Sequence, residues 1–252
     1  MKKLFIFLLI GGVASWGLTG CMDTENGGNY QTTPVMPVVV KHNPEKGITT
    51  VLTYVGEVAV PEFSKLDQND CLLTQLKIDY DNQPQPSPGY YVATVVDYLQ
   101  VDAGSARVED EFSIGDFTLP IEDMGIYPYT TNNGILVLDG RYFVQIKHTI
   151  PKDQGVNYKL VAARDSVDEK TGVQNVYLLA KGKNENDGKA SEVQNIHAFD
   201  LKDIFALGRD TTLNEVKLKY IKINLKYFNG EKEGEPVFKK LNTSPIELAI
   251  YK

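Results

Sequence analysis

The chain has 252 residues, of which 42% are hydrophobic and 23% charged, and its net charge at pH 7 is −7. This acidic balance excludes binding to nucleic acid through a basic surface, and it predicts repulsion from anionic lipid. The length fits one large β domain or two small ones.

The first 20 residues have the layout of a secretory signal peptide. Lys2 and Lys3 give a positive start, residues 4–10 form an unbroken apolar run, and residues 11–20 are rich in small side chains. An uncleaved transmembrane helix is the alternative, but the dense apolar part is shorter than the roughly 20 residues that a span needs. We therefore expect residues 1–20 to be a signal peptide.

Cys21 follows the run Leu-Thr-Gly, and this stretch resembles the lipobox of bacterial lipoproteins. The resemblance implies cleavage before Cys21, which would then carry acyl chains such as palmitate on its sulfur and its amine. Several chains are needed because one chain anchors a protein only marginally. Cleavage leaves 24 basic and 33 acidic side chains, so the mature net charge is −9 (24 − 33).

Asp23 and Glu25 resemble the acidic surface-export signal of Bacteroidetes lipoproteins. We therefore expect an outer-membrane lipoprotein, with exposure at the cell surface as a further hypothesis. If Cys21 carries lipid, Cys71 has no partner for a disulfide within the chain. Its place at the start of a strand-like run predicts a buried, small hydrophobic residue.

Residues 21–45 are polar and punctuated by Gly and Pro, which predicts a lipidated cysteine followed by a flexible tether, although part of "VMPVVV" could dock on the first domain. Strand patterns follow. "CLLTQLKIDY" alternates as a half-buried strand does, "YYVATVVDYLQV" is apolar on both faces, and "FSIGDFTLPI" ends the block. Several short strands predict a small OB-like barrel over residues 46–121.

Residues 122–134 hold Gly, Pro and paired Asn, and we expect them to be a linker. After them, Asp139-Gly140 predicts a hairpin with a type I′ turn. "FDLKDIFALG" predicts a short helix that Asp200 caps and Gly208 ends. "EVKLKYIKINLKYF" predicts a long strand with a bulge near Ile221, and "PIELAIYK" could close the sheet. These features predict an immunoglobulin-like β-sandwich over residues 135–252, so the expected fold class is all-β.

This order of features resembles the NigD-like lipoproteins of Bacteroidetes, on "FSKLDQNDCLLTQLKIDYDN…GYYVATVVDYLQV" in the first block and "GRYFVQIKHTI…NYKLVAARD…NVYLLAKGKNENDG…HAFDLKDI" in the second. The resemblance covers most of the mature chain. It implies a lipidated N-terminus, an OB-like domain and a C-terminal sandwich, and it implies no known catalytic activity. Tyr158 stands where those proteins often have histidine, and the first block departs from the pattern considerably.

The residues that could carry chemistry are scattered. His42, His148 and His197 lack metal-ligand spacing, and no nucleophile motif accompanies them, so we expect structural roles, no metal, no cofactor and no enzyme activity. Calcium is conceivable at Glu109-Asp110-Glu111, at Asp79 with Asp81, or at "NENDG", but solvated loops are favoured. Tyrosines at Tyr127, Tyr129 and Tyr90-Tyr91 could stack on sugars, although strand tyrosines are more often core.

The expected function is a non-enzymatic binding or interaction module at the outer membrane, held there by lipid on Cys21, for a glycan or a protein partner. A structural or accessory subunit of a surface assembly is the alternative, as is an immunity-type protective lipoprotein. A hydrolase would need two carboxylates facing across a cleft, which sequence does not reveal.

Overall fold

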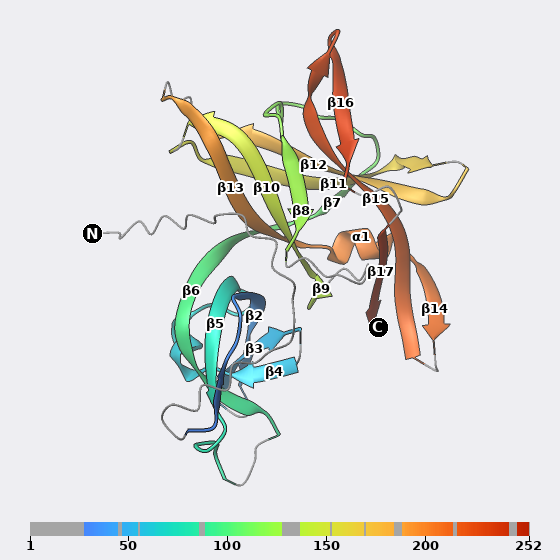
Figure 1. The fold of residues 1–252 in the computed structure, drawn as a ribbon. Coiled ribbons are helices and arrows are strands. Elements are labelled where there is room, and N and C mark those ends of the chain that lie inside the picture. The colour runs from blue at the N-terminus through green and yellow to red at the C-terminus, as the bar shows by residue number, and fades with distance from the viewer. Residues whose placement is uncertain are drawn as a thin grey trace.

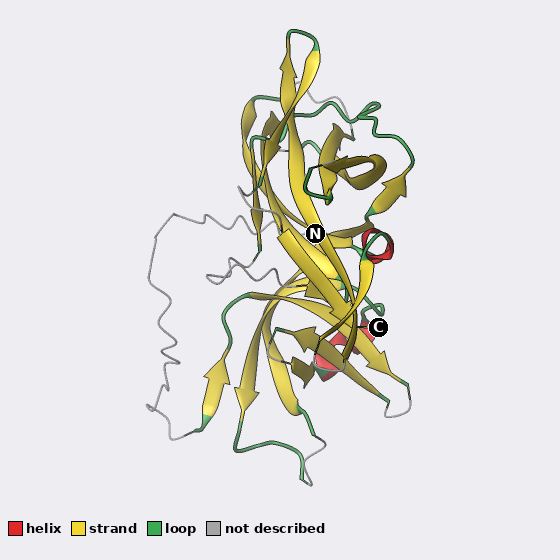
Figure 2. Cartoon of the chain, turned by 90° about the vertical axis from the view of Figure 1, so that its right-hand side faces the viewer, coloured by secondary structure: helices red, strands yellow, loops and turns green. Residues whose placement is uncertain are grey.

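The computed structural model of the chain describes residues 28–44, 47–54, 56–85, 89–127, 137–151, 153–168, 170–183, 188–213, 216–241 and 246–251. Strands build a closed barrel at one end of the molecule and a two-sheet sandwich at the other (Figure 1). Helical turns are few and short (Figure 2). The expected all-β fold, a small barrel followed by a sandwich with one short α-helix, is confirmed. The signal peptide and Cys21 lie outside the described residues.

The barrel closes because β5 pairs with β2 on one edge and with β6 on the other, in the order β5-β2-β3-β4-β6. Phe63 of the 3-10 helix η2 (Pro61–Lys65) and aliphatic residues of β2, β3, β4, β5 and β6 fill its interior. The strands are β1 (Tyr30–Thr32), β2 (Met36–Asn43), β3 (Ile48–Thr53), β4 (Gly56–Ala59), β5 (Cys71–Asp79) and β6 (Tyr91–Ser105).

The sandwich packs the sheet β13-β10-β8 against the sheet β14-β15-β12-β11-β7. Its elements are β7 (Arg107–Glu109), β8 (Asp123–Ile126), β9 (Val137–Leu138), β10 (Arg141–Pro151), β11 (Val156–Asp168), β12 (Val173–Gly182), β13 (Ala190–Asp200), α1 (Lys202–Ala206), β14 (Arg209–Leu213), β15 (Val216–Lys232), β16 (Glu235–Lys240) and β17 (Ile246–Tyr251). The predicted Asp139-Gly140 turn is confirmed, since both residues have positive φ and join β9 to β10.

Strand β6 belongs to both bodies. Its first part pairs with β4 and β5 of the barrel, and residues 102–105 pair in parallel with β13 of the sandwich. Figure 1 shows β6 leaving the barrel and continuing to the base of the sandwich. The chain therefore passes from one body to the other within a single strand.

The prediction of a flexible tether over residues 21–45 is wrong for residues 30–32 and 36–43, which form β1 and β2, whereas the alternative that part of "VMPVVV" docks on the first domain is confirmed. β2 carries five consecutive buried residues, Met36 to Val40. Even-numbered side chains such as Val38 face the barrel interior, whereas Val39 packs toward the sandwich. A strand buried on both faces lacks the alternation by which strands are recognised, which explains the error.

Two further expectations need correction around the second body. Residues 112–121 form no strand; instead Phe112, Ile114 and Phe117 pack as a loop on the outer face of the sandwich. The linker expected over 122–134 begins as strand β8, which pairs with β10. Residues 128–134 lie outside the described residues.

The long strand and the helix are confirmed with changed details. β15 shows no bulge at Ile221, because its register with β17 is continuous there, and the irregularity lies after Phe228. Leu201 is the N-cap residue of α1, while the Asp200 carboxylate accepts a hydrogen bond from the Lys202 amide at 2.9 Å. Gly208 is needed for space, since a Cβ there would lie 2.7 Å from the Tyr220 carbonyl oxygen.

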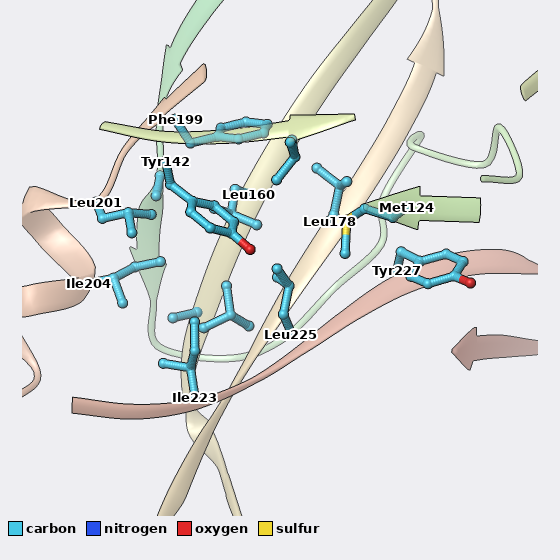
Figure 3. Packing of buried hydrophobic residues seen from close by; sticks show 14 of the residues in the cluster. Met124, Tyr142, Leu160, Leu178, Phe199, Leu201, Ile204, Ile223, Leu225 and Tyr227 are labelled. Carbon is cyan, nitrogen blue, oxygen red and sulfur yellow. The ribbon is translucent and has the colours of Figure 1, made fainter. Parts of the chain in front are cut away.

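Two buried side-chain polar atoms have no partner among the described residues, and one of them, the Tyr142 hydroxyl, lies in the hydrophobic core of the sandwich. Tyr142 on β10 is buried among Leu160, Leu178 and Leu225, and its hydroxyl points into this cluster (Figure 3). Burial raises the pKa of the Tyr142 hydroxyl far above its usual range. A buried hydroxyl without a hydrogen bond lowers stability.

Tyr142→Phe should therefore raise the free energy of unfolding, by about 1 kcal/mol. Tyr158→Phe is the matched control, because the Tyr158 hydroxyl accepts a hydrogen bond from Asn195 at 2.9 Å and its loss should lower stability by about as much. Urea denaturation of both variants measures the two changes. Equal destabilisation by both substitutions would contradict this account of Tyr142.

Candidate functional site

The seam between barrel and sandwich is closed and apolar. Val39, Cys71, Leu73 and Val101 from the barrel side pack against Leu138, Phe143 and Ala198 from the sandwich side. Tyr127, a candidate sugar platform from the sequence, is half-buried against this cluster. Tyr129 lies outside the described residues. The seam therefore offers Tyr127 no open groove for a ligand.

Cys71 lies in this seam, as expected for a buried small hydrophobe, and it is 1% exposed. Burial raises the pKa of the Cys71 thiol to about 11, although the nearby Arg141 guanidinium acts in the opposite direction. Arg141 also forms an ion pair with Asp200. A thiol with a raised pKa and no access to solvent is a poor nucleophile, so Cys71 contributes packing.

His148 and His197 lie near each other in the sandwich, on either side of Tyr158. The His148 Nδ1 donates to the Pro120 carbonyl at 2.8 Å, so its Nε2 is free to accept from the Tyr158 hydroxyl at 3.1 Å. The same hydroxyl accepts from Asn195. Burial lowers the pKa of His148. This network uses both nitrogens of a neutral His148 and leaves neither for catalysis.

His197 is different, because its Nε2 is buried without a partner among the described residues. It lies 3.2 Å from where a Cβ on Gly104 would be, so the absence of a side chain at Gly104 makes room for the ring. Burial lowers the pKa of His197 to about 4, with Asp102 opposing this shift and Lys183 adding to it.

Acid should therefore destabilise the protein through His197. The unfolded chain binds a proton on this residue below pH 6.5, whereas the folded chain does so only near pH 4. Stability due to His197 is full above pH 6.5 and falls by up to about 1.4 kcal/mol per pH unit between these values. Thermal unfolding of His197→Phe should show a shallower loss over this pH range than the unchanged protein.

His148→Phe is the comparison for this prediction. It removes the hydrogen bond to Pro120 and should lower stability at neutral pH, since the Pro120 carbonyl loses its partner. Parallel pH profiles for His197→Phe and the unchanged protein would contradict the assignment to His197.

The remaining candidate metal-binding or catalytic side chains from the sequence form hydrogen bonds or ion pairs within the protein. His42 lies in β2, where its ring nitrogens contact the Thr49 hydroxyl at 3.0 Å and the Leu66 carbonyl at 2.8 Å. Glu109 pairs with Lys159, and Asp110 lies 3.4 Å from Arg164.

The acidic turn at Asp79 bonds internally, with its carboxylate accepting from the Asp81 amide and from the Asn82 amide and side chain. Residues 184–187, from the Asn/Asp-rich loop, lie outside the described residues. Within the described ranges, no three His, Cys, Asp or Glu side chains gather in a group that could hold a metal ion.

The feature that stands out is a row of exposed hydrophobic residues on β6, which we name the β6 strip: Tyr91, Val96, Tyr98 and Leu99. Their exposed fractions are 53%, 52%, 49% and 62%. Seven large hydrophobic side chains are exposed among the described residues, and four of them lie on this one strand. The sequence predicted an apolar strand here but did not single it out as a site.

A bulge contributes to the exposure of the β6 strip. Leu76 and Gln75 of β5 are opposite Val95 and Asp97, which leaves Val96 as an extra residue without a partner on β5. A bulge re-aims the side chains beside it and increases the local twist. Tyr98 contacts Phe63 of η2 edge-on at 5.2 Å between ring centroids, and Tyr91 contacts Tyr80 in the same manner at 5.4 Å.

Comparison with known proteins supports the fold. No protein-family model matches the chain, and no curated protein matches it in sequence. Among solved structures, an uncharacterized protein from Parabacteroides merdae is 15% identical with a TM-score of 0.59, over 82% of this chain and 96% of that one. A candidate lipoprotein from Bacteroides fragilis is 16% identical with a TM-score of 0.55, over 89% of this chain and 99% of that one.

A NigD-like immunity protein from Bacteroides caccae is also among the structural neighbours, at 12% identity and a TM-score of 0.48, over 82% of this chain and 92% of that one. At these identities the likeness concerns the fold alone. In the described part of the chain, the helices are too short or too polar to cross a membrane. The chain thus has the all-β architecture of structures solved from Bacteroides and Parabacteroides.

Proposed function

We propose that the protein is an outer-membrane lipoprotein, anchored through lipid on Cys21, that acts without catalysis as a docking module for a partner protein. The β6 strip is the observation that carries this proposal. Exposed hydrophobic residues that gather on one element are typical of an interaction surface, whereas single scattered ones are not.

Two observations favour the lipid anchor. Residues 18–21 match the pattern of a lipobox behind an apolar leader. A structural neighbour that aligns over 89% of this chain is described as a candidate lipoprotein. A lipid anchor at Cys21 would place the β6 strip within reach of other proteins of the envelope. The strip would also be within reach of such proteins if the anchored protein is exposed at the cell surface.

The character of the β6 strip favours a protein partner over a glycan. Val96 and Leu99 are aliphatic, and both tyrosines of the β6 strip already contact another aromatic ring. Sugar-binding platforms present open aromatic faces, whereas protein interfaces bury aliphatic and aromatic side chains together.

Absence of catalysis is supported by the state of the reactive groups. Cys71 is buried, and both nitrogens of His148 are engaged in hydrogen bonds.

The anchor is tested by growing cells with an alkyne-bearing fatty acid and measuring its incorporation into the protein. Incorporation should be lost in Cys21→Ser and retained in Cys71→Ser, which removes the other cysteine of the chain. Label that persists in Cys21→Ser would contradict the anchor.

Docking is tested in the same cells with a photo-crosslinking residue at position 99 of the β6 strip or at position 167 of β11. Val167 is exposed to a similar degree, at 40%, but belongs to β11 of the sandwich. A crosslinked protein that appears only from position 99 is the expected result. Equal crosslinking from both positions would overturn docking at β6.

A further inference from the structure

We propose that the outer edge of β6, between Val95 and Val101, binds an extended segment of the partner protein as an added β-strand. We further infer that this segment carries apolar side chains flanked by Lys or Arg. The inference rests on the function proposed above and specifies the chemistry of the partner.

The outer edge of β6 is unpaired along its middle part. Residues 93–101 of β6, except the bulged Val96, pair with β5 on one side. On the other side, β4 pairs only up to Val92 and β13 begins pairing only at Asp102. Among the described residues, no strand fills the space between them. Because β4 pairs with the start of β6 and β13 with its end, the two leave a gap longer than an average strand of about five to six residues.

Along this edge, two backbone amides of β6 are hydrogen-bonded to side chains. The Val95 amide donates to the Glu62 carboxylate at 3.4 Å, and the Tyr98 amide donates to the Asp97 carboxylate at 2.8 Å. Both acceptors are side chains that can rotate away. The carbonyl oxygens of an incoming strand could replace them, as occurs when a peptide adds to a sheet edge.

Exposed hydrophobic side chains flank this edge. Val96, Tyr98 and Leu99 are each about half exposed or more. Tyr98 and Leu99 are adjacent in the strand, so their side chains point to opposite faces of the sheet. A strand docked at this edge would find a hydrophobic neighbour on each face, which is the arrangement that gives side-chain specificity in strand addition.

The negative charge of this edge indicates that a basic segment of the partner protein would bind there. Between Tyr91 and Ser105, β6 contains Asp97 and Asp102 and no Lys or Arg. Glu62 of η2 adds a third carboxylate at the edge. A second copy of this chain would bring Asp97 and Glu62 against the same residues of its twin, and like charges placed opposite each other in a sheet are destabilising. A basic segment of another protein avoids this repulsion.

The test uses the mature chain with Cys21→Ser and synthetic peptides of roughly eight residues, the length of a typical strand. One peptide alternates Val and Thr between terminal lysines, a second replaces the lysines with glutamates, and a third carries a central proline. Binding is measured by fluorescence anisotropy. The lysine peptide should bind, and the other two should bind at least about tenfold more weakly.

Single substitutions test whether the peptide binds at this edge of β6. Val96→Lys should weaken binding of the lysine peptide at least about tenfold, whereas Val167→Lys, on an exposed valine of β11, should leave it unchanged. Asp97→Lys should reverse the preference toward the glutamate peptide. Binding should also protect the Val95 and Tyr98 amides from hydrogen exchange.

Several results would overturn the inference. They are equal binding of all peptides or none, equal effects of Val96→Lys and Val167→Lys, and a dimer in sedimentation that Val96→Lys dissociates, which would make a second copy the occupant. Crosslinking from position 99 without any peptide binding would overturn this inference and leave the proposed docking function standing. Glycan binding that Leu99→Lys abolishes would overturn both.

Discussion

The pairing of β6 with strands of both bodies is the constraint on which the rest of the structure depends. One edge of β6 closes the barrel against β5, and its last residues join the sandwich sheet beside β13. Because hydrogen bonds of a single strand serve both bodies, neither can rotate relative to the other without breaking a ladder. The apolar seam around Phe143 and Cys71 then fills the angle between them.

The same constraint exposes the candidate site. A strand long enough to serve two sheets must cross the space between its neighbours, and β4 and β13 leave its middle open. In a typical sheet such an edge would be shielded by charge, Pro or a bulge. Here Asp97, Glu62 and the bulge at Val96 supply part of that protection, while Tyr98 and Leu99 keep the surface hydrophobic. That combination is expected of an edge which binds a selected partner and resists general aggregation.

Much of the fold could be predicted from local sequence, and the exceptions share a physical cause. The Asp139-Gly140 turn and the short helix α1 carry signals within a few residues, and both are present. The sequence of β2 predicts a tether because its two buried faces belong to different bodies, which no local pattern encodes. β6 shows the reverse: its sequence is apolar on both faces, yet its outer edge lies in a gap that exists only once β4 and β13 are placed. The candidate site was missed for that reason.

Calorimetric unfolding of the mature chain tests most directly the claim that β6 and the seam make one unit of barrel and sandwich. A single transition whose calorimetric and van't Hoff enthalpies agree is the expected result. Phe143→Ala in the seam should lower the temperature of that transition, and unfolding should remain a single transition. Two separate transitions in the unchanged protein, one for each body, would contradict the account.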